Sequence, residues 1–425
     1  MEKASQERKI VFAKFWKRKG ILRNIIIFFL VIGPAIITSS VGNDAGGIAT
    51  YSLAGANFGY TMIWSLLPIT IALIIVQVMC ARMGIVTGKG LAGLIRENYG
   101  VKITFFVMLV LLFGNFTNIL SEFSGIAASA EIFGVNKYIS LPLSALFVWL
   151  LVVKGTYKSV EKVFLIGCIF YATYIVSGFL ANPDWNEVVA DSVVKPKVVF
   201  EHNYTVMLLG IIGTTIAPWM LFYLQASIVD KGVKIEEYKH SRLEVIIGSI
   251  VVSIIIFFII VACAATIHKT GMKIETVADA ANALRPLAGI YCSALFAFGL
   301  LNASLLAASV LPLATAYSIC EGFGWETGVD KKFKEAPYFF GLYTALIILG
   351  AGIVLIPNFP LLKVMYFSQV NNGILLPFAL IFMLLISNRR DLMGQYVNSK
   401  TFNIIVWIFV LIMIILSIFM LVTLF

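Results

Sequence analysis

The sequence predicts an all-α integral membrane protein with eleven transmembrane helices. Hydrophobic residues make up 60% of the 425 residues, charged residues make up 13%, and the mean hydropathy is +0.95. A soluble domain carries about twice that charged fraction. Apolar segments of about 20 residues, the length that crosses a bilayer, recur along the whole chain. Clusters of glycine interrupt two of these segments. Together these observations exclude a soluble globular protein.

Short polar loops separate the apolar segments, so we expect one membrane domain with no soluble domain attached. The predicted spans are 24–54, 59–84, 102–130, 137–154, 159–181, 205–230, 241–268, 284–320, 337–357, 360–387 and 402–425. The first ten spans form two runs of five, and the eleventh is an addition.

The distribution of basic residues predicts the orientation of the chain. If the N-terminus is cytoplasmic, the inner loops hold 25 of the 32 Lys and Arg residues. Cytoplasmic loops carry such an excess. We therefore expect a multi-pass protein of the plasma (inner) membrane with an extracellular C-terminus. The net charge of +10 then needs no nucleic-acid partner. The basic segment 1–23 either fixes topology as a solvated tail or lies on anionic lipid as an amphipathic segment.

A glycine-rich hexapeptide, GNDAGG at 42–47, lies inside the first apolar span. Three glycines in six residues predict a break in the helix. Within a membrane, irregular backbone is tolerated only where protein or a water-filled cavity shields it from lipid. The carboxylate of Asp44 at that depth costs about 2.5–3.5 kcal/mol. A bound cation would offset this cost. The alternative is a protonated or hydrogen-bonded Asp44 that serves packing alone.

The sixth span contains a second candidate break, GIIGTTIAP at 210–218. Pro218 removes an amide donor and disfavours helix at the residue before it. A kinked but continuous helix is the alternative. Each break lies in the first span of a run of five.

Interrupted helices at matching places in two halves are typical of transporters built from inverted repeats. We therefore expect a first repeat at 24–181 and a second at 205–388, with 402–425 outside both. The binding site would then lie near the bilayer midplane, where the two breaks meet.

Several motifs resemble the Nramp family of divalent-metal transporters, and the resemblance covers nearly the whole chain in order. It implies a LeuT-type fold with two inverted five-helix repeats and broken helices one and six. The motifs that carry it are Gly33-Pro34, Asp44-Ala45-Gly46-Gly47-Ile48-Ala49-Thr50, Gly55-Ala56, Gly59-Tyr60, Trp64, Ala81-Arg82-Met83-Gly84-Ile85-Val86-Thr87-Gly88-Lys89, Glu321-Gly322-Phe323, Ser368-Gln369-Val370, Leu376-Pro377-Phe378-Ala379-Leu380 and Ser387-Asn388-Arg389-Arg390.

The resemblance also implies a metal site, from which this sequence departs. In the family, an Asp and an Asn of the first helix hold the metal together with a Met of the sixth helix and a backbone carbonyl one turn before it. Asp44 matches the Asp, and Thr214 would supply the carbonyl. Gly47 stands in place of the Asn, and Ala217 stands in place of the Met. Gln369 in the tenth span is a possible further oxygen donor.

These replacements favour a different ion. Thioether ligands suit transition metals, whereas carboxylate, carbonyl and water suit Mg²⁺, Ca²⁺ and Mn²⁺. Mg²⁺ dehydrates reluctantly and keeps several waters while one or two carboxylates hold it. We therefore predict transport of partly hydrated Mg²⁺, and also of Mn²⁺, with no cofactor. The pattern resembles the prokaryotic Nramp-related magnesium transporters.

Coupling to protons is predicted to be absent. Proton-coupled Nramps have an Asp and a Glu one turn apart in span three, a His in span six and an Arg pair in span nine. Here Glu122 matches the Glu, but Ile119 and Trp219 stand at the Asp and His positions. Span nine opens with 338–343, YFFGLY, which has no arginine. Glu122 itself either faces the cavity or pairs with Asn118, one turn back.

Other transport functions are compatible with parts of the same sequence. A proton-coupled Mn²⁺/Fe²⁺ Nramp transporter is the main alternative, and a LeuT-fold amino-acid or organic-cation transporter is a weaker one. A channel would need rows of like polar groups along a pore, so one carboxylate at two helix breaks favours alternating access. No catalytic constellation occurs in any span, and we expect a monomer that is not an enzyme. Asn371 and Asn372 either contact the ion's water shell or hold a distortion near Gly373.

Overall fold

The computed structural model describes residues 43–154, 169–194, 201–230, 232–329 and 331–423. Within these ranges every regular element is helical, and short 3₁₀ or π turns connect several of the helices. The helices are α3 (Ala45–Phe58), α4 (Leu66–Thr87), α5 (Leu91–Ile132), α6 (Lys137–Lys154), α8 (Ile169–Leu180), α9 (Trp185–Val189), α10 (His202–Thr215), α11 (Pro218–Asp230), α12 (Tyr238–Cys263), α13 (Val277–Ala280), α14 (Arg285–Ala288), α15 (Cys292–Phe323), α16 (Pro337–Val354), α17 (Leu361–Ser387), α18 (Arg390–Met393) and α19 (Lys400–Thr423).

Eight helical stretches of the described chain are long and apolar enough to cross a membrane. Two shorter apolar helices, Lys137–Val153 and Tyr171–Leu180, lie where the fourth and fifth spans are predicted. The basic segment 1–23, the first span up to residue 42 and part of the fifth span lie outside the described residues. The all-helical fold class is confirmed, whereas the count of eleven crossings and the bounds of the two repeats stay predictions.

The predicted break in the sixth span is confirmed, because α10 and α11 are separate helices. α10 ends at Thr215, and the backbone of Ile216 is not helical, with φ −125° and ψ 70°. α11 then begins at Pro218, a residue that has no amide hydrogen to continue the first helix. In the first span, the backbone of Asp44 is extended, with φ −68° and ψ 179°, and α3 begins directly after it. α3 therefore begins at the first glycine-rich motif and α10 ends at the second, and the part of the first span before residue 43 lies outside the described residues.

α5 starts eleven residues before the predicted third span, which was placed at 102–130. Its polar first part is joined to the apolar part at Gly100, where φ is 78° and ψ is 172°. The carboxylate of Glu321, at the end of α15, lies against Gly90 and Gly93; an added Cβ on Gly93 would be 2.9 Å from Glu321 Oε1. A carboxylate at a helix N-terminus stabilises that turn. Hydropathy alone does not reveal this buried contact.

The eighth span also differs from its prediction, which placed its start at residue 284. The chain from 277 to 291 forms only short helical turns, and α15 begins at Cys292. Gly289 ends the last of the short α-helices with a positive φ of 53°, a conformation that glycine adopts without strain. The sequence is apolar on both sides of this boundary, so hydropathy does not predict where the short helices end and α15 begins.

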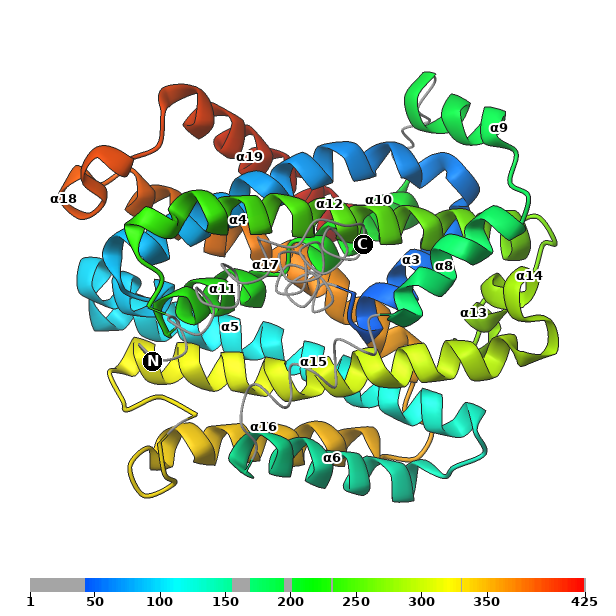
Figure 1. The fold of residues 1–425 in the computed structure, drawn as a ribbon, viewed down its shortest axis with the longest axis horizontal. Helices are drawn as coiled ribbons and strands as arrows, with labels where there is room; N and C mark the ends of the chain where they lie inside the picture. Colours follow the sequence, from blue (N-terminus) through cyan, green and yellow to red (C-terminus); the bar gives the residue numbers. More distant parts are fainter. Residues whose placement is uncertain (1–42, 155–168, 195–200, 231, 330, 424–425) are drawn as a thin grey trace, which may run out of the picture.

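The helices pack in three groups that run roughly along the long axis of the molecule. α5 and α15 lie side by side, and α6 and α16 cover them on one face (Figure 1). α4 and α12 pack together on the opposite face. Between the two groups lie α3, α10, α11 and α17, which contact one another in the centre (Figure 1). The two breaks therefore meet inside the protein, away from the outer surface.

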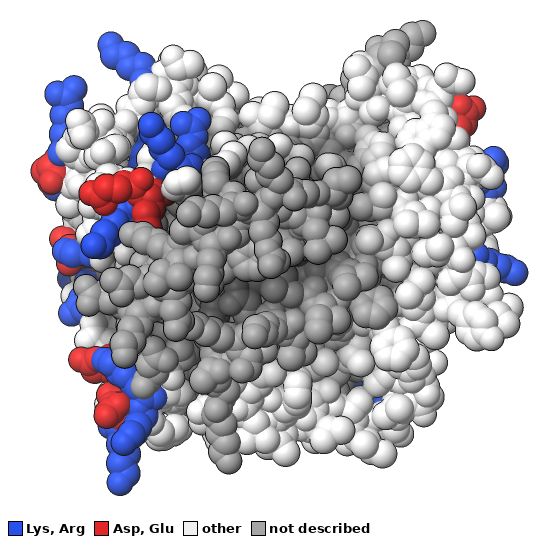
Figure 2. All heavy atoms as spheres, viewed as in Figure 1, with Lys and Arg blue, Asp and Glu red and all other residues white. Residues whose placement is uncertain are grey.

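Most charged side chains gather at the two ends of the long axis, and the described surface between them is almost entirely uncharged in this view (Figure 2). Large apolar side chains are exposed over this middle region. On α19, for example, the exposed residues are Ile404, Ile408, Leu411, Ile415, Ile418 and Val422. Such a surface would not be stable in water, and it fits contact with lipid chains.

α10 and α17 approach each other closely through two glycines. An added Cβ on Gly213 would overlap the carbonyl oxygen of Gln369 and would lie 2.9 Å from the Cα of Gly373. An added Cβ on Gly373 would lie 2.5 Å from the carbonyl oxygen of Leu209. The contacting atoms belong to the backbone and cannot rotate away. Glycine at these positions is therefore what places α17 beside the break in α10.

We expect Gly213→Ala to lower the free energy of unfolding by about 1–3 kcal/mol, because the helices must separate to admit the methyl group. Thermal unfolding of the purified protein in detergent measures this change. Gly341→Ala is the matched control, because Gly341 is exposed on α16 and an added Cβ there meets no atom within 4 Å. Equal melting temperatures for the two variants would contradict the close approach.

Candidate functional site

Asp44 lies at the start of α3 and is almost fully buried, with 4% of its surface exposed. Its Oδ1 accepts a hydrogen bond of 2.7 Å from the amide of Gly47, which makes Asp44 the N-cap of the helix. A carboxylate is stabilised there by the free amides and by the positive end of the helix dipole. The second oxygen, Oδ2, accepts no hydrogen bond from the described residues. One oxygen thus holds the helix, and the other is available to a ligand.

Glu122 brings a second carboxylate to the same helical turn. It projects from α5, is completely buried, and its Oε2 accepts a hydrogen bond of 3.2 Å from the amide of Ala45. Its Oε1 has no hydrogen-bond partner among the described residues. Glu122 therefore contacts the break and does not pair with Asn118, which was one of the two interpretations. Two acidic side chains converge on the first turn of α3.

The end of α10 supplies oxygen atoms to the same region. The carbonyl of Thr214 would normally accept a helical hydrogen bond from residue 218, but Pro218 has no amide hydrogen. That carbonyl is therefore left without its helical partner, as the ligand role predicted for it requires. The adjacent Thr215 hydroxyl lies 3.0 Å from the hydroxyl of Tyr51 on α3. This contact fixes the end of α10 beside α3.

Gln369 of α17 lies between the two broken helices and is completely buried. Its Nε2 occupies the place that a Cβ on Gly46 would take, and its backbone carbonyl lies against Gly213. Its Oε1 accepts a hydrogen bond of 3.0 Å from Asn372. In this structure Gln369 thus presents its amide nitrogen to α3, and its side-chain oxygen is already bonded.

Buried amides join α5 to α17 beside Gln369. Asn118 donates to the Oδ1 of Asn372 at 2.8 Å, and Asn372 donates back to the Oδ1 of Asn118 at 2.9 Å. Asn371 donates to the hydroxyl of Thr117 at 3.1 Å. α17 runs as one helix from Leu361 to Ser387 and contains Pro377 four residues after Gly373. The reciprocal amide bonds fix the helix that carries Gln369.

Gly47 and Ala217, the two replaced ligand positions, contribute no side-chain donor. The amide of Gly47 is bonded to Asp44, and the carbonyl of Ala217 accepts from the amide of Met220 at 3.1 Å. Gly47 leaves out side-chain volume next to the Asp44 carboxylate, and Ala217 packs in an apolar cluster with Ile119 and Trp219. Of the five predicted site residues, Asp44 and Gly47 share one turn of α3, Thr214 and Ala217 flank the break in α10–α11, and Gln369 packs against Gly46.

Two buried polar residues were missed by the sequence reasoning, Asn43 and Ser121. Both side chains are completely buried and have no hydrogen-bond partner among the described residues. The backbone carbonyl of Asn43 accepts a hydrogen bond of 2.7 Å from the hydroxyl of Tyr171. An unsatisfied buried polar group costs about 1–3 kcal/mol. Their positions beside Asp44 and Glu122 were the only signal in the sequence.

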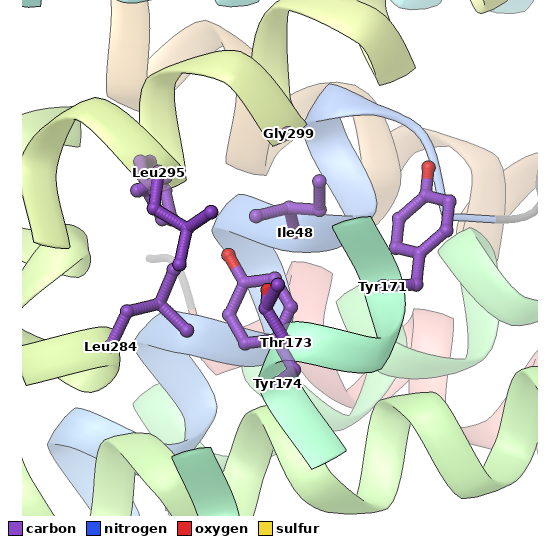
Figure 3. A pocket seen from close by; sticks show the side chains of 8 residues that line it. Ile48, Tyr171, Thr173, Tyr174, Leu284, Leu295 and Gly299 are labelled. Carbon is purple, nitrogen blue, oxygen red and sulfur yellow. The ribbon is translucent and has the colours of Figure 1, made fainter. Parts of the chain in front are cut away.

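A pocket next to the break is a different feature. It lies between α3, α8 and α15, and Ile48, Tyr171 and Tyr174 point into it (Figure 3). Its other lining residues are Thr173, Leu284, Leu295, Phe296 and Gly299. No lining residue carries a charge, so the pocket lacks the ligands of a cation site. Tyr171 connects the pocket to the site, because its hydroxyl donates a hydrogen bond to the backbone carbonyl of Asn43.

The site therefore consists of oxygen donors around a helix N-terminus. Its observed oxygens are those of the Asp44 and Glu122 carboxylates at the first turn of α3, and the carbonyl of Thr214 at the end of α10 stays a predicted ligand. Within the described part of the chain, no three His, Cys, Asp or Glu side chains form a metal-binding group. Such a donor set suits a hard cation that brings part of its coordination sphere as water.

Comparisons of sequence support one family. A sequence model of the Nramp family, described as natural resistance-associated macrophage protein-like, matches residues 35–423. The divalent metal cation transporter MntH of Clostridium acetobutylicum is 28% identical over 95% of this chain and 93% of its own length. The protein of the same name from Deinococcus radiodurans is 28% identical over 93% of this chain and 89% of its own length.

Solved structures share the fold. The manganese transporter of Eremococcus coleocola, in complex with an aromatic bis-isothiourea substituted compound, has a TM-score of 0.75 and 20% identity over 94% of this chain and 87% of that one. MhsT in complex with L-phenylalanine has a TM-score of 0.60 and 15% identity over 92% and 98%. These likenesses confirm the predicted LeuT-type fold. Since the family model spans nearly the whole sequence, the chain belongs to the Nramp family.

Proposed function

We propose that this protein imports divalent cations across the plasma membrane by alternating access, and that it carries Mg²⁺, and also Mn²⁺, as a partly hydrated ion. The observation that carries the proposal is the site between the two helix breaks, which has buried carboxylates, unpartnered oxygens and no soft ligand. The names of the relatives, divalent metal cation transporter and manganese transporter, support the substrate class. The chain would act as a carrier and catalyse no reaction.

The small residues Gly47 and Ala217, at positions where the family has Asn and Met, support retention of water by the ion. An Asn and a Met at these positions would fill the space beside Asp44 and replace two ligands. With glycine and alanine there, that space remains for water. Mg²⁺ binds through few carboxylates and keeps several waters, because removing them is costly. A site with this composition should also accept Mn²⁺, which prefers oxygen ligands as well.

The surroundings of the site support transport without protons. Ile119 and Trp219 belong to a buried apolar cluster that also includes Phe123 and Phe339. An added Cβ on Gly350 of α16 would lie 2.6 Å from a methyl carbon of Ile119, so little space for water is left between α5 and α16. A proton relay through a membrane needs a chain of titratable groups. The membrane potential alone supplies about 4.6 kcal/mol per 100 mV to a divalent ion.

Two other transport functions each have one observation in their favour, and transport experiments distinguish them from the proposed one. Proton-coupled transport of Mn²⁺ or Fe²⁺ is favoured by one observation, the buried carboxylate of Glu122 beside the break. Transport of an amino acid is favoured by the fold shared with MhsT. Against the second, the N-terminal turn of α3 is already bonded to the carboxylates of Asp44 and Glu122. A substrate carboxylate would meet like charges there.

Purified protein in liposomes tests the proposal directly. We expect wild type to take up Mg²⁺ and Mn²⁺ without acidifying the lumen, because apolar Ile119 and Trp219 stand where a proton relay would need titratable groups. Asp44→Ala should abolish uptake of both ions, since it removes the carboxylate at the break. Glu97→Ala, which removes an exposed charge paired with Lys89 at 2.7 Å, should transport normally. Lumenal acidification that follows the uptake of Mg²⁺ or Mn²⁺ would contradict uncoupled transport.

Returning a thioether to the site should change its selectivity. We expect Ala217→Met to increase the affinity for Cd²⁺ and Mn²⁺ relative to Mg²⁺, because sulfur binds softer ions and fills space used by water. Competition of each metal with Mg²⁺ uptake gives the ratio of affinities. Ala217→Leu is the control for volume, since it adds bulk without sulfur. If Met and Leu shift the ratio equally, position 217 does not contact the ion.

A further inference from the structure

We infer that Ser121 and the free oxygen of Glu122, which both reach the first turn of α3 from α5, accept hydrogen bonds from water molecules bound to the transported ion. This inference rests on the proposed transport of a partly hydrated cation and assigns positioning residues to it. The Ser121 hydroxyl is completely buried and has no partner among the described residues. Neither the fold nor the packing of α5 explains a polar atom left in that state.

Ser121 differs from the other two buried serines of α5, Ser124 and Ser129. A helical serine commonly donates to the carbonyl four residues earlier. Ser124 does so to Leu120 at 2.7 Å, and Ser129 does so to Gly125 at 2.7 Å. The hydroxyl of Ser121 makes no such bond. Its oxygen is therefore free to interact outside its own helix.

The position of this oxygen connects it to the ion site. A Cβ added to Gly46 would lie 2.9 Å from Ser121 Oγ, so the hydroxyl lies against the first turn of α3. Glu122, the next residue along α5, bonds to the amide of Ala45 in the same turn. Both side chains thus reach the helix end that Asp44 caps. Two unpartnered oxygens, Ser121 Oγ and Glu122 Oε1, belong to adjacent residues there.

The chemistry of coordinated water requires acceptors at these positions. A water bound to a cation directs its oxygen to the metal, and its hydrogens point outward toward acceptors. A serine hydroxyl has two lone pairs, and a carboxylate oxygen accepts as well. Gln369, on the α17 side of the site, cannot take this part here because its Nε2 faces Gly46 and its Oε1 is bonded to Asn372. Ser121 Oγ and Glu122 Oε1 on α5 are acceptors that still lack a partner among the described residues.

This arrangement favours an ion that keeps its water. Mg²⁺ releases water reluctantly and would use the acceptors of α5 through its hydration shell. An ion that exchanges those waters for direct ligands gains less from the same oxygens. Removing the Ser121 hydroxyl should therefore weaken Mg²⁺ more than Mn²⁺. An effect limited to folding would change both ions alike.

The test compares Ser121→Ala with Ser124→Ala in proteoliposomes. Both variants remove a buried hydroxyl from α5, but the hydroxyl of Ser124 is bonded within its own helix. We expect Ser121→Ala to raise the KM for Mg²⁺ about fivefold, the effect of one lost hydrogen bond. The KM for Mn²⁺ should rise less, and Ser124→Ala should leave the ratio of the two KM values unchanged.

A second variant places a reporter at the same position. Ser121→Cys should make Mg²⁺ uptake sensitive to Cd²⁺, because a thiolate at the site binds soft ions. Ser124→Cys should show the wild-type response to Cd²⁺. Equal Cd²⁺ inhibition of the two cysteine variants would overturn the placement of Ser121 at the ion.

The outcomes separate this inference from the proposed function. If wild type takes up no Mg²⁺, the proposed function fails before Ser121 is considered. If wild type transports Mg²⁺ but Ser121→Ala matches Ser124→Ala, the function stands and the role of Ser121 is wrong. An equal rise in the KM values for Mg²⁺ and Mn²⁺ would likewise overturn the inference, because it would indicate a purely structural hydroxyl.

Discussion

The burial of two carboxylates at the start of one helix is the constraint on which the rest of this structure depends. Asp44 and Glu122 both bond to amides in the first turn of α3 and have almost no exposed surface. The helix dipole and these hydrogen bonds stabilise part of the negative charge. Each carboxylate still retains an oxygen without a described partner. A divalent cation would neutralise the pair, and this relation links the helix break to the proposed transport.

Glycine makes that arrangement sterically possible. Gln369 occupies the space beside Gly46, and α17 reaches α10 only because Gly213 and Gly373 have no side chains. The amide pair between Asn118 and Asn372 then ties α17 to α5, which carries Glu122. Helices distant in the sequence are thereby held around one small polar region. A transporter that alternates between states needs such a fixed site at the point where its broken helices meet.

Much of the fold could be predicted, because hydropathy and helix-breaking residues act locally. The glycines around Asp44 marked the start of α3, and the proline at 218 marked the start of α11. Tertiary contacts were beyond the same reasoning. The partner of Glu122 proved to be the amide of Ala45, 77 residues away, and Asn118 proved to bond to α17. Ser121 was missed because one serine in a helix carries no pattern, and its missing hydrogen bond and its position against Gly46 appear only in the structure.

The most direct test of the account counts the waters on the bound ion. Mn²⁺ serves as a paramagnetic probe, and electron–nuclear double resonance in ¹⁷O-enriched water measures the water oxygens that it retains. The account predicts several water ligands, with carboxylate and carbonyl oxygens completing the sphere and Asp44→Ala abolishing the bound signal. A bound ion with no water ligand, or one coordinated by nitrogen or sulfur, would contradict a hydrated-ion site at the two helix breaks.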